Sequence, residues 1–189
     1  MPDTEPRFDI LFVCTGNQCR SALAEVITRT LADTLPVGVS SAGTMALRPT
    51  PSPIETVQAA STLGYHLIGH MSRPLAEADA AASDLVVGFE LTHVATAVVD
   101  HGVDRTKTFL LKELVDALEQ AGAAAHEDIV ATARSVIAAA NERRASAFPG
   151  LEHQIADPIG RSARTHMETA RTIDDLCRRL VTRLFPNRH

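Results

Sequence analysis

Near its N-terminus the chain passes from an apolar run straight into a glycine-containing loop and then into a helical pattern, an order that few folds accommodate. The apolar run, residues 8–13, is typical of a buried strand. The loop, Cys14–Ser21, reads CTGNQCRS. Beyond it, apolar side chains recur at every fourth position and predict a helix of roughly three turns; they are Leu23, Ile27, Leu31 and Leu35. A strand, a loop and a helix in this order are typical of an α/β fold.

The alternation of strand and helix patterns continues along the chain. Short apolar runs at 37–39, 84–88 and 107–111 predict further strands, and helix-compatible sequence follows the last two. The tetrapeptide SPIE at Ser52–Glu55 has the pattern of a capping box with proline at the first helical position, and it predicts a helix that runs to Gly64. Strands that alternate with helices predict a parallel sheet.

The last third of the chain reads as helical. Between residues 113 and 150 the sequence is rich in Ala, Glu and Arg, and Gly122 is the expected break between two helices. Apolar side chains at helical spacing then predict a long C-terminal helix; they are Ile173, Leu176, Leu180 and Leu184. A length of 189 residues fits one domain. We therefore expect a single domain over residues 1–189, with a helical insertion at 113–150.

Composition and charge limit the classes of partner. A net charge of −5 gives no general reason to expect binding to nucleic acid or to an acidic membrane surface. No apolar run approaches the ~20 residues that a membrane span requires, and the N-terminal segment MPDTEPRFD is unlike a targeting segment. Three cysteines, two of them in one loop, argue against a secreted disulfide framework. We expect a cytoplasmic protein.

Cys14 and Arg20 have the spacing Cys-x5-Arg, which is weak evidence alone, because Cys177 and Arg183 repeat it within a helical pattern. The context of the first pair is different. A strand precedes it, the glycine and asparagine between the two residues tolerate a positive φ, and a helix follows. Backbone N–H groups can then converge at the helix N-terminus and form an anion cradle. Arg20 would add a bidentate clamp on two oxygens of an oxyanion such as phosphate.

The positive field of such a cradle favours a thiolate at Cys14, which would attack phosphorus. A cysteine at a strand end is otherwise most often a small buried hydrophobe. Ser21 would cap the helix, stabilise the thiolate, or do both. Cys19 is either structural or the partner of Cys14 in a reversible disulfide, and we interpret Cys177 as a core residue.

No cluster of His, Cys or carboxylates in the sequence has the spacing of metal ligands, so we expect no metal and no cofactor.

The motif CTGNQCRS resembles that of the low-molecular-weight protein tyrosine phosphatase family and agrees with it at every fixed position. The resemblance extends over most of the chain, through SSAGT at 40–44, GYHLIGHMSRPL at 64–75, SDLVVGFELTHV at 83–94 and the pair Asp157-Pro158. It implies an α/β fold with a doubly wound, four-stranded parallel sheet. It also implies a phosphatase of phosphorylated protein, with phosphotyrosine as the leading substrate and with phosphate or a similar oxyanion bound in the loop.

The same resemblance implies roles for individual residues. It makes Cys14 the nucleophile that becomes phosphorylated, Arg20 the phosphate ligand and Asp157 the general acid and base. It identifies the phosphate-binding loop as Thr15, Gly16, Asn17, Gln18, Cys19 and Ser21, and the residues that support the loop as Ser41 and His70.

The chain also departs from the family pattern. Ala22 replaces a common proline, which a helix start tolerates. Ile159 and Gly160 follow Asp-Pro, where tyrosine phosphatases usually carry aromatic side chains that wall the substrate ring, so the preference for phosphotyrosine stays open. The only tyrosine, Tyr65, is far from the acid in the sequence, which excludes the regulatory tyrosine that some relatives have beside it.

Three alternatives remain open. Thioredoxin-coupled arsenate reductases have a similar loop but relay electrons through further cysteines, and this chain has none between Cys19 and Cys177; a reductase that uses an external thiol would need only Cys14. Protein arginine phosphatases resemble the loop with Thr in place of Gln18. A phosphate-binding module without turnover is the third, and the retained Asp157 argues against it.

Overall fold

The computed structural model describes residues 7–121, 128–144 and 149–186, and it contains a four-stranded parallel sheet with the strand order β2-β1-β3-β4. The strands are β1 Phe8–Cys14, β2 Val37–Gly43, β3 Leu85–Gly88 and β4 Thr108–Leu110. The α-helices are α1 Arg20–Leu31, α2 Ile54–Thr62, α3 Leu91–Val99, α4 Leu111–Gln120, α5 Ile129–Arg143 and α6 Ala163–Leu184. This arrangement confirms the predicted α/β fold with a four-stranded parallel sheet.

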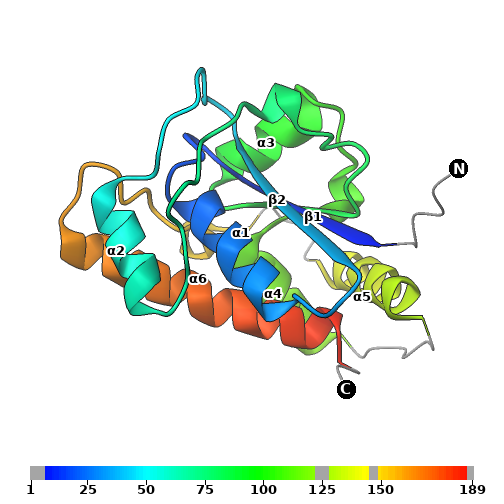
Figure 1. Cartoon of the computed structure of the whole chain (residues 1–189). Coiled ribbons are helices and arrows are strands. Elements are labelled where there is room, and N and C mark those ends of the chain that lie inside the picture. The colour runs from blue at the N-terminus through cyan, green and yellow to red at the C-terminus, as the bar shows by residue number, and fades with distance from the viewer. Residues whose placement is uncertain (1–6, 122–127, 145–148, 187–189) are drawn as a thin grey trace, which may run out of the picture.

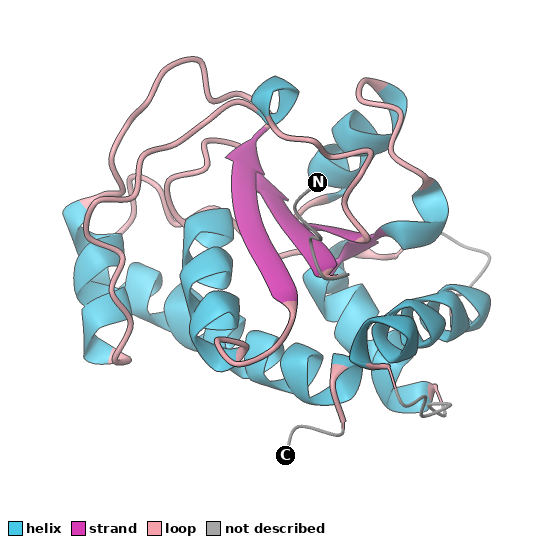
Figure 2. Ribbon diagram, turned by 45° about the vertical axis from the view of Figure 1, so that its right-hand side comes forward, coloured by secondary structure: helices cyan, strands magenta, loops and turns pink. Residues whose placement is uncertain are grey.

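Helices cover both faces of the sheet (Figure 2). Because successive side chains of a strand point to opposite faces, β1 contributes to two cores. Ile10 and Phe12 enter the larger core, which also contains apolar side chains of α1, α4, α5 and α6. Leu11 and Val13 enter a smaller core with residues of β3 and α3. A first strand that is buried on both sides reads as a continuous apolar run, which is what the sequence shows.

The C-terminal helix α6 runs across the molecule beside α1, α2 and α4 (Figure 1). The predicted apolar positions Ile173, Leu176, Leu180 and Leu184 are all buried. The opposite face of the helix is charged. Within the described residues, no helix is both long enough and apolar enough to cross a membrane.

The start of α2 differs from the prediction. Pro53 is the N-cap residue rather than the first helical residue, the helix ends at Thr62, and no side chain caps its N-terminus. The hydroxyl of Ser52 is buried without a hydrogen-bond partner. The expected capping box at Ser52–Glu55 is therefore wrong, because Pro53 occupies the N-cap position and Ser52 lies one residue before it.

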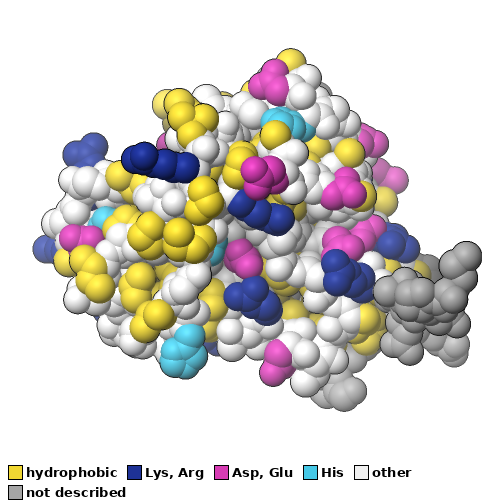
Figure 3. Space-filling model, turned by 45° about the horizontal axis from the view of Figure 1, so that its top comes forward, with side chains coloured by type: hydrophobic (Ala, Val, Ile, Leu, Met, Phe, Trp, Pro, Cys, Tyr) yellow, Lys and Arg dark blue, Asp and Glu magenta, His cyan; other side chains and the backbone are white. Residues whose placement is uncertain are grey.

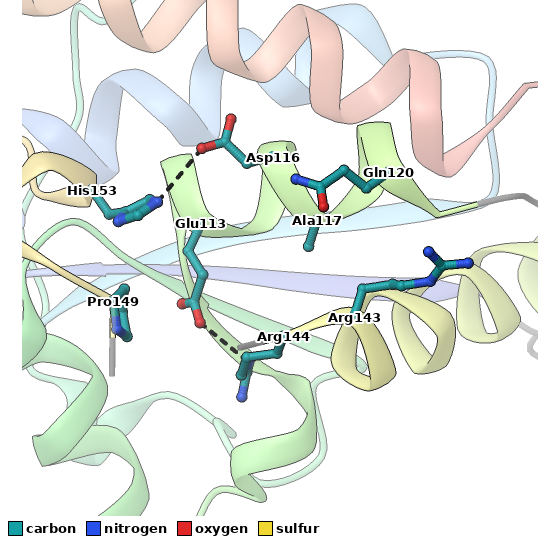
Figure 4. A pocket seen from close by; sticks show the side chains of 8 residues that line it. All are labelled: Glu113, Asp116, Ala117, Gln120, Arg143, Arg144, Pro149 and His153. Atoms are coloured by element: carbon teal, nitrogen blue, oxygen red, sulfur yellow. Dashed lines mark ion pairs between the residues drawn. The ribbon is translucent and has the colours of Figure 1, made fainter. Parts of the chain in front are cut away.

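The two helices expected between residues 113 and 150 are present as α4 and α5, and a buried ion pair joins them. Arg144, the C-cap residue of α5, lies 3.1 Å from the Glu113 carboxylate, stacks 3.7 Å above the ring of Phe109 and donates hydrogen bonds to the carbonyls of Arg105 and Thr108. Figure 4 shows this pair on the wall of a small pocket between the two helices. The pair connects the helices to the edge strand β4.

Candidate active site

The loop that holds Cys14 lies at the carboxyl end of β1, where the strand order changes direction between β1 and β3. In open α/β sheets this is the position where ligands bind. Cys14 is the last residue of β1 and Arg20 is the first residue of α1, so residues 15–19 form the whole connection. Figure 1 shows this turn beside the segments that follow β2 and precede α6.

Asn17 gives the loop its shape. Its φ of 52° is the only positive value at a non-glycine residue among those described, and asparagine tolerates this left-handed conformation better than most residues. The conformation directs the Asn17 backbone N–H to the sulfur of Cys14, at 3.2 Å. Gly16, which would also tolerate a positive φ, does not adopt one.

The side chain of Asn17 is buried and uses all of its hydrogen-bonding groups. Its Nδ2 donates to the hydroxyls of Ser21, at 2.9 Å, and Ser41, at 2.7 Å, and its Oδ1 accepts from the backbone N–H of Arg73 at 2.9 Å. His70 Nε2 donates to the Asn17 carbonyl at 2.7 Å. Both supporting residues predicted from the sequence, Ser41 and His70, therefore contact the residue with the unusual backbone conformation.

Ser21 contacts the sulfur of Cys14 directly, with an Oγ–Sγ distance of 2.9 Å. It does not cap α1, whose N-cap residue is Cys19 and whose N-terminus has no side-chain cap. Because the Ser21 oxygen already accepts from Asn17, its proton is free to point to Cys14. Of the two roles considered for Ser21, the geometry supports stabilisation of a thiolate.

Gly43 allows a second backbone segment to approach the loop. A Cβ atom at this position would lie 2.8 Å from the carbonyl oxygen of Thr15 and 2.9 Å from the backbone nitrogen of Asn17. The residues after Gly43 bond to the loop, because Thr44 and Met45 donate their backbone N–H groups to the carbonyls of Cys14 and Thr15. The glycine of SSAGT is thus required by this contact.

Arg20 is fully buried and is surrounded by acceptors. Its NH2 group donates to Asp157 Oδ2 at 2.6 Å, and its NH1 group donates to the carbonyl of Ile155 at 2.9 Å and lies 3.1 Å from Glu90 Oε2. Arg20 Nε is buried without a partner. One nitrogen of the guanidinium is therefore free to bind an oxyanion, while the others hold it in place.

Asp157 comes from the loop before α6 and is brought to the cradle by this contact. Its carboxylate is about one third exposed, and Oδ1 accepts from the backbone N–H of Ile159 at 3.1 Å. The three predicted catalytic residues, Cys14, Arg20 and Asp157, therefore lie in one site although 137 positions separate the last two.

The other two cysteines are buried thiols. Cys19 contacts the Thr56 hydroxyl at 3.1 Å, and burial raises the pKa of its thiol to about 12. Burial likewise raises the pKa of Cys177 to about 12, in agreement with its interpretation as a core residue. All three cysteines are in the reduced form in this structure.

One polar and one apolar side chain lie beside Gly16 of the loop. A Cβ atom on this glycine would lie 3.7 Å from Gln18 Nε2 and 3.9 Å from Ile159 Cδ1. Met45 and Leu47, in the segment after β2, are exposed apolar residues. Figure 3 views the molecule with the top of Figure 1 brought forward. On this face the hydrophobic side chains gather mostly on the left half.

Four charged or polar residues of the site were not predicted from the sequence: Glu25, Arg73, Glu90 and His93. Glu25 accepts a hydrogen bond from the Ser41 hydroxyl, at 2.5 Å, and Arg73 Nε donates to the Ser41 carbonyl at 2.9 Å. Glu90 and His93 lie within SDLVVGFELTHV, a segment that carries part of the family resemblance but in which no site residue was predicted. The available signal was the position of both residues within a few residues of the carboxyl end of a buried strand.

Comparison with known proteins gives a consistent result. The family described as low molecular weight phosphotyrosine protein phosphatase matches residues 9–130. A protein-arginine-phosphatase of Bacillus subtilis is 29% identical over 186 residues, which cover 95% of this chain and 99% of the relative. A low molecular weight protein-tyrosine-phosphatase of Escherichia coli is 36% identical over 111 residues, covering 58% of this chain and 73% of the relative.

One solved structure has a fold similar to that of this chain over almost the full length of both chains. It is an arginine phosphatase in which serine replaces the active-site cysteine and is phosphorylated; it is 29% identical to this chain, has a TM-score of 0.70 and covers 96% of this chain and 98% of its own.

Proposed function

This chain belongs to the low molecular weight phosphotyrosine protein phosphatase family, and we propose that it hydrolyses phosphorylated protein through a phosphocysteine intermediate on Cys14. The observation that carries the proposal is the convergence of the Cys14 sulfur, the Arg20 guanidinium and the Asp157 carboxylate at one end of the sheet. Each of these groups has a role in phosphoryl transfer to a thiolate.

In the first half-reaction the loop N–H groups and the free Arg20 nitrogen bind the oxygens of the phosphoryl group. The Cys14 thiolate, stabilised by the Ser21 hydroxyl and the Asn17 N–H, attacks phosphorus. The S–P bond forms, the bond between phosphorus and the leaving group breaks, and Asp157 donates its proton to the leaving atom.

In the second half-reaction the free protein side chain has left and a water molecule takes its place. Asp157 accepts a proton from this water, whose oxygen attacks the phosphorus of phosphocysteine. The S–P bond breaks, the thiolate is regenerated and inorganic phosphate leaves. The solved relative with a phosphorylated active-site serine supports an intermediate at this position.

The contact between Arg20 and Asp157 connects substrate binding to acid catalysis. Without an oxyanion, Arg20 NH2 holds the Asp157 carboxylate at 2.6 Å. A phosphoryl oxygen competes for the same N–H groups, because it carries more negative charge and accepts the guanidinium in a bidentate geometry. We propose that substrate binding releases Asp157 from Arg20, so that its carboxyl group can take up the proton that it later donates, and turns it toward the leaving group.

Phosphotyrosine is the first substrate that we propose, because Ile159, an exposed side chain beside Gly16 of the loop, offers apolar surface to a ring. Phosphoarginine is the second, because the Bacillus subtilis arginine phosphatase aligns with 95% of this chain, and the Gln18 amide provides a polar wall. Helices α4 and α5 pack on the same sheet and on α6, which supports our proposal of one catalytic domain.

The substrate is tested by turnover of a phosphotyrosine peptide, a phosphoarginine protein, and arsenate with a thiol. Turnover of arsenate alone would exclude the proposed phosphatase activity.

The role of Asp157 as the general acid is tested with Asp157→Asn. This change should lower the rate about 10²- to 10⁴-fold with phosphotyrosine peptide. The loss should be much smaller with nitrophenyl phosphate, whose leaving group barely requires a proton. Glu152→Gln, in the same segment and exposed, is the matched control. Equal losses with both substrates would place the acid elsewhere.

A further inference from the structure

Four polar side chains form a closed ring beside the phosphate-binding loop. His93 Nε2 lies 3.0 Å from Thr15 Oγ1, and Arg20 NH2 donates to the same oxygen at 3.4 Å. Arg20 NH1 lies 3.1 Å from Glu90 Oε2, and that oxygen lies 3.3 Å from His93 Nε2. The ring therefore connects the first residue of the loop, the arginine and the start of α3.

The hydrogen bonds of His93 determine its tautomer. Nδ1 accepts from the backbone N–H groups of Phe89, at 3.3 Å, and Glu90, at 3.1 Å, so it carries no proton. The hydrogen of the neutral ring is then on Nε2, which donates to Thr15. His93 is 1% exposed, and burial together with the nearby Arg20 lowers the pKa of the ring to about 3. A neutral ring avoids a second cation beside the guanidinium.

We infer that His93 is a positioning residue for the phosphate-binding arginine and acts through the hydroxyl of Thr15. This inference rests on the proposed function for the role of Arg20 as the phosphate ligand. His93 also caps α3, but the cap uses only Nδ1. The Nε2 contact with Thr15 is not needed by the helix, and it holds the Thr15 oxygen toward Arg20 NH2.

The ring of four side chains matters when the oxyanion binds, because it keeps the guanidinium of Arg20 in place. NH2 of Arg20 is held by Asp157 and by Thr15. If a phosphoryl oxygen displaces Asp157, Thr15 remains to fix this side of the guanidinium and Glu90 remains on the other. Loss of the Thr15 hydroxyl should therefore weaken oxyanion binding even though the hydroxyl need not touch the oxyanion.

The experiment measures the dissociation constant of inorganic phosphate by calorimetry for the full chain and its variants. Thr15→Val should weaken phosphate binding about three- to tenfold, the value of one hydrogen bond. Thr92→Val removes an exposed hydroxyl from the same helix as His93 and should have no effect. Equal phosphate affinity in the two variants would overturn the inference, and this comparison does not depend on the folding of any His93 variant.

His93 variants separate positioning from capping. His93→Gln keeps an acceptor for the Glu90 N–H, as glutamine does in a capping box, and its amide can donate to Thr15, so it should retain most of the affinity. His93→Leu should lose as much phosphate affinity as Thr15→Val, and the double variant should lose no more, because both changes interrupt the same connection from His93 through Thr15 to Arg20. Losses that multiply in the double variant would contradict the inference. A wild type that binds phosphate but turns over no phosphorylated substrate would refute the proposed function alone.

Discussion

His93 should make the protein less stable as the pH falls, because its ring is neutral in the folded state and becomes protonated in the unfolded chain. The pKa of the buried ring is about 3, against 6.5 for an exposed histidine. Between these values the unfolded chain binds one proton that the folded protein does not. Stability therefore rises with pH in this range and is lost as the pH is lowered from 6.5 toward 3.

The size of the effect follows from the two pKa values. One extra proton in the unfolded state gives a slope of up to about 1.4 kcal/mol per pH unit. Between pH 7 and pH 4.5, we expect His93 to reduce the free energy of unfolding by about 2.5 kcal/mol. This is a large share of the ~5–15 kcal/mol that stabilises a typical domain.

The assay is urea unfolding at a series of pH values between 7 and 4.5, for wild type, His93→Gln and His66→Gln. Glutamine does not titrate, so the difference in stability between wild type and His93→Gln should shift by about 2.5 kcal/mol across the range. His66→Gln changes an exposed histidine and is the control for a histidine-to-glutamine substitution. Parallel pH profiles for wild type and His93→Gln would show that His93 is protonated in the folded protein and would refute the reasoning.

Three further predictions concern the site and its support. Cys14→Ser should abolish turnover in a phosphatase assay but keep part of the phosphate affinity in calorimetry, because the loop N–H groups and Arg20 remain; substantial turnover would exclude the cysteine mechanism. Arg144→Ala should lower the free energy of unfolding by about 1.5–3 kcal/mol, because it removes the nearer of the two arginines that pair with the buried Glu113 carboxylate, whose other partner, Arg105, lies 3.6 Å away; the control Arg143→Ala changes an exposed residue of the same helix end and should cost little in the same urea titration. Cys19, with a thiol pKa of about 12, should resist alkylation by iodoacetamide at pH 8 in the native state; rapid modification seen by mass spectrometry would contradict its burial.

The elements of the fold could be predicted from the sequence because each depends on a local pattern. The strand at Phe8–Cys14 is buried on both faces and therefore reads as a continuous apolar run. The long helix α6 has an apolar face at the predicted positions. The predicted start of α2 was wrong by one residue, because Pro53 takes the N-cap position and Ile54 is the first helical residue, a choice that the tetrapeptide alone does not decide.

The core of the site was also predictable, since its closest contacts join residues that are near in sequence. Asn17 and Ser21 contact Cys14 across three and seven positions, within one turn between a strand and a helix. The choice of Asp157 came only from a resemblance, because nothing in an Asp-Pro pair indicates that it lies beside an arginine 137 positions away.

The remaining parts of the site were decided by tertiary structure alone. His93 and Thr15 are 78 positions apart and meet because parallel pairing of β1 with β3 places the carboxyl ends of both strands at one edge of the sheet. Glu25 lies on the side of α1 that faces Ser41 of β2, and Glu90 reaches Arg20 from the N-terminus of α3. A sequence shows that such residues are polar, but their partners depend on strand register and on the face that each helix turns to the sheet. These are properties of the packed chain, since the apolar contacts that fix them join segments far apart in sequence.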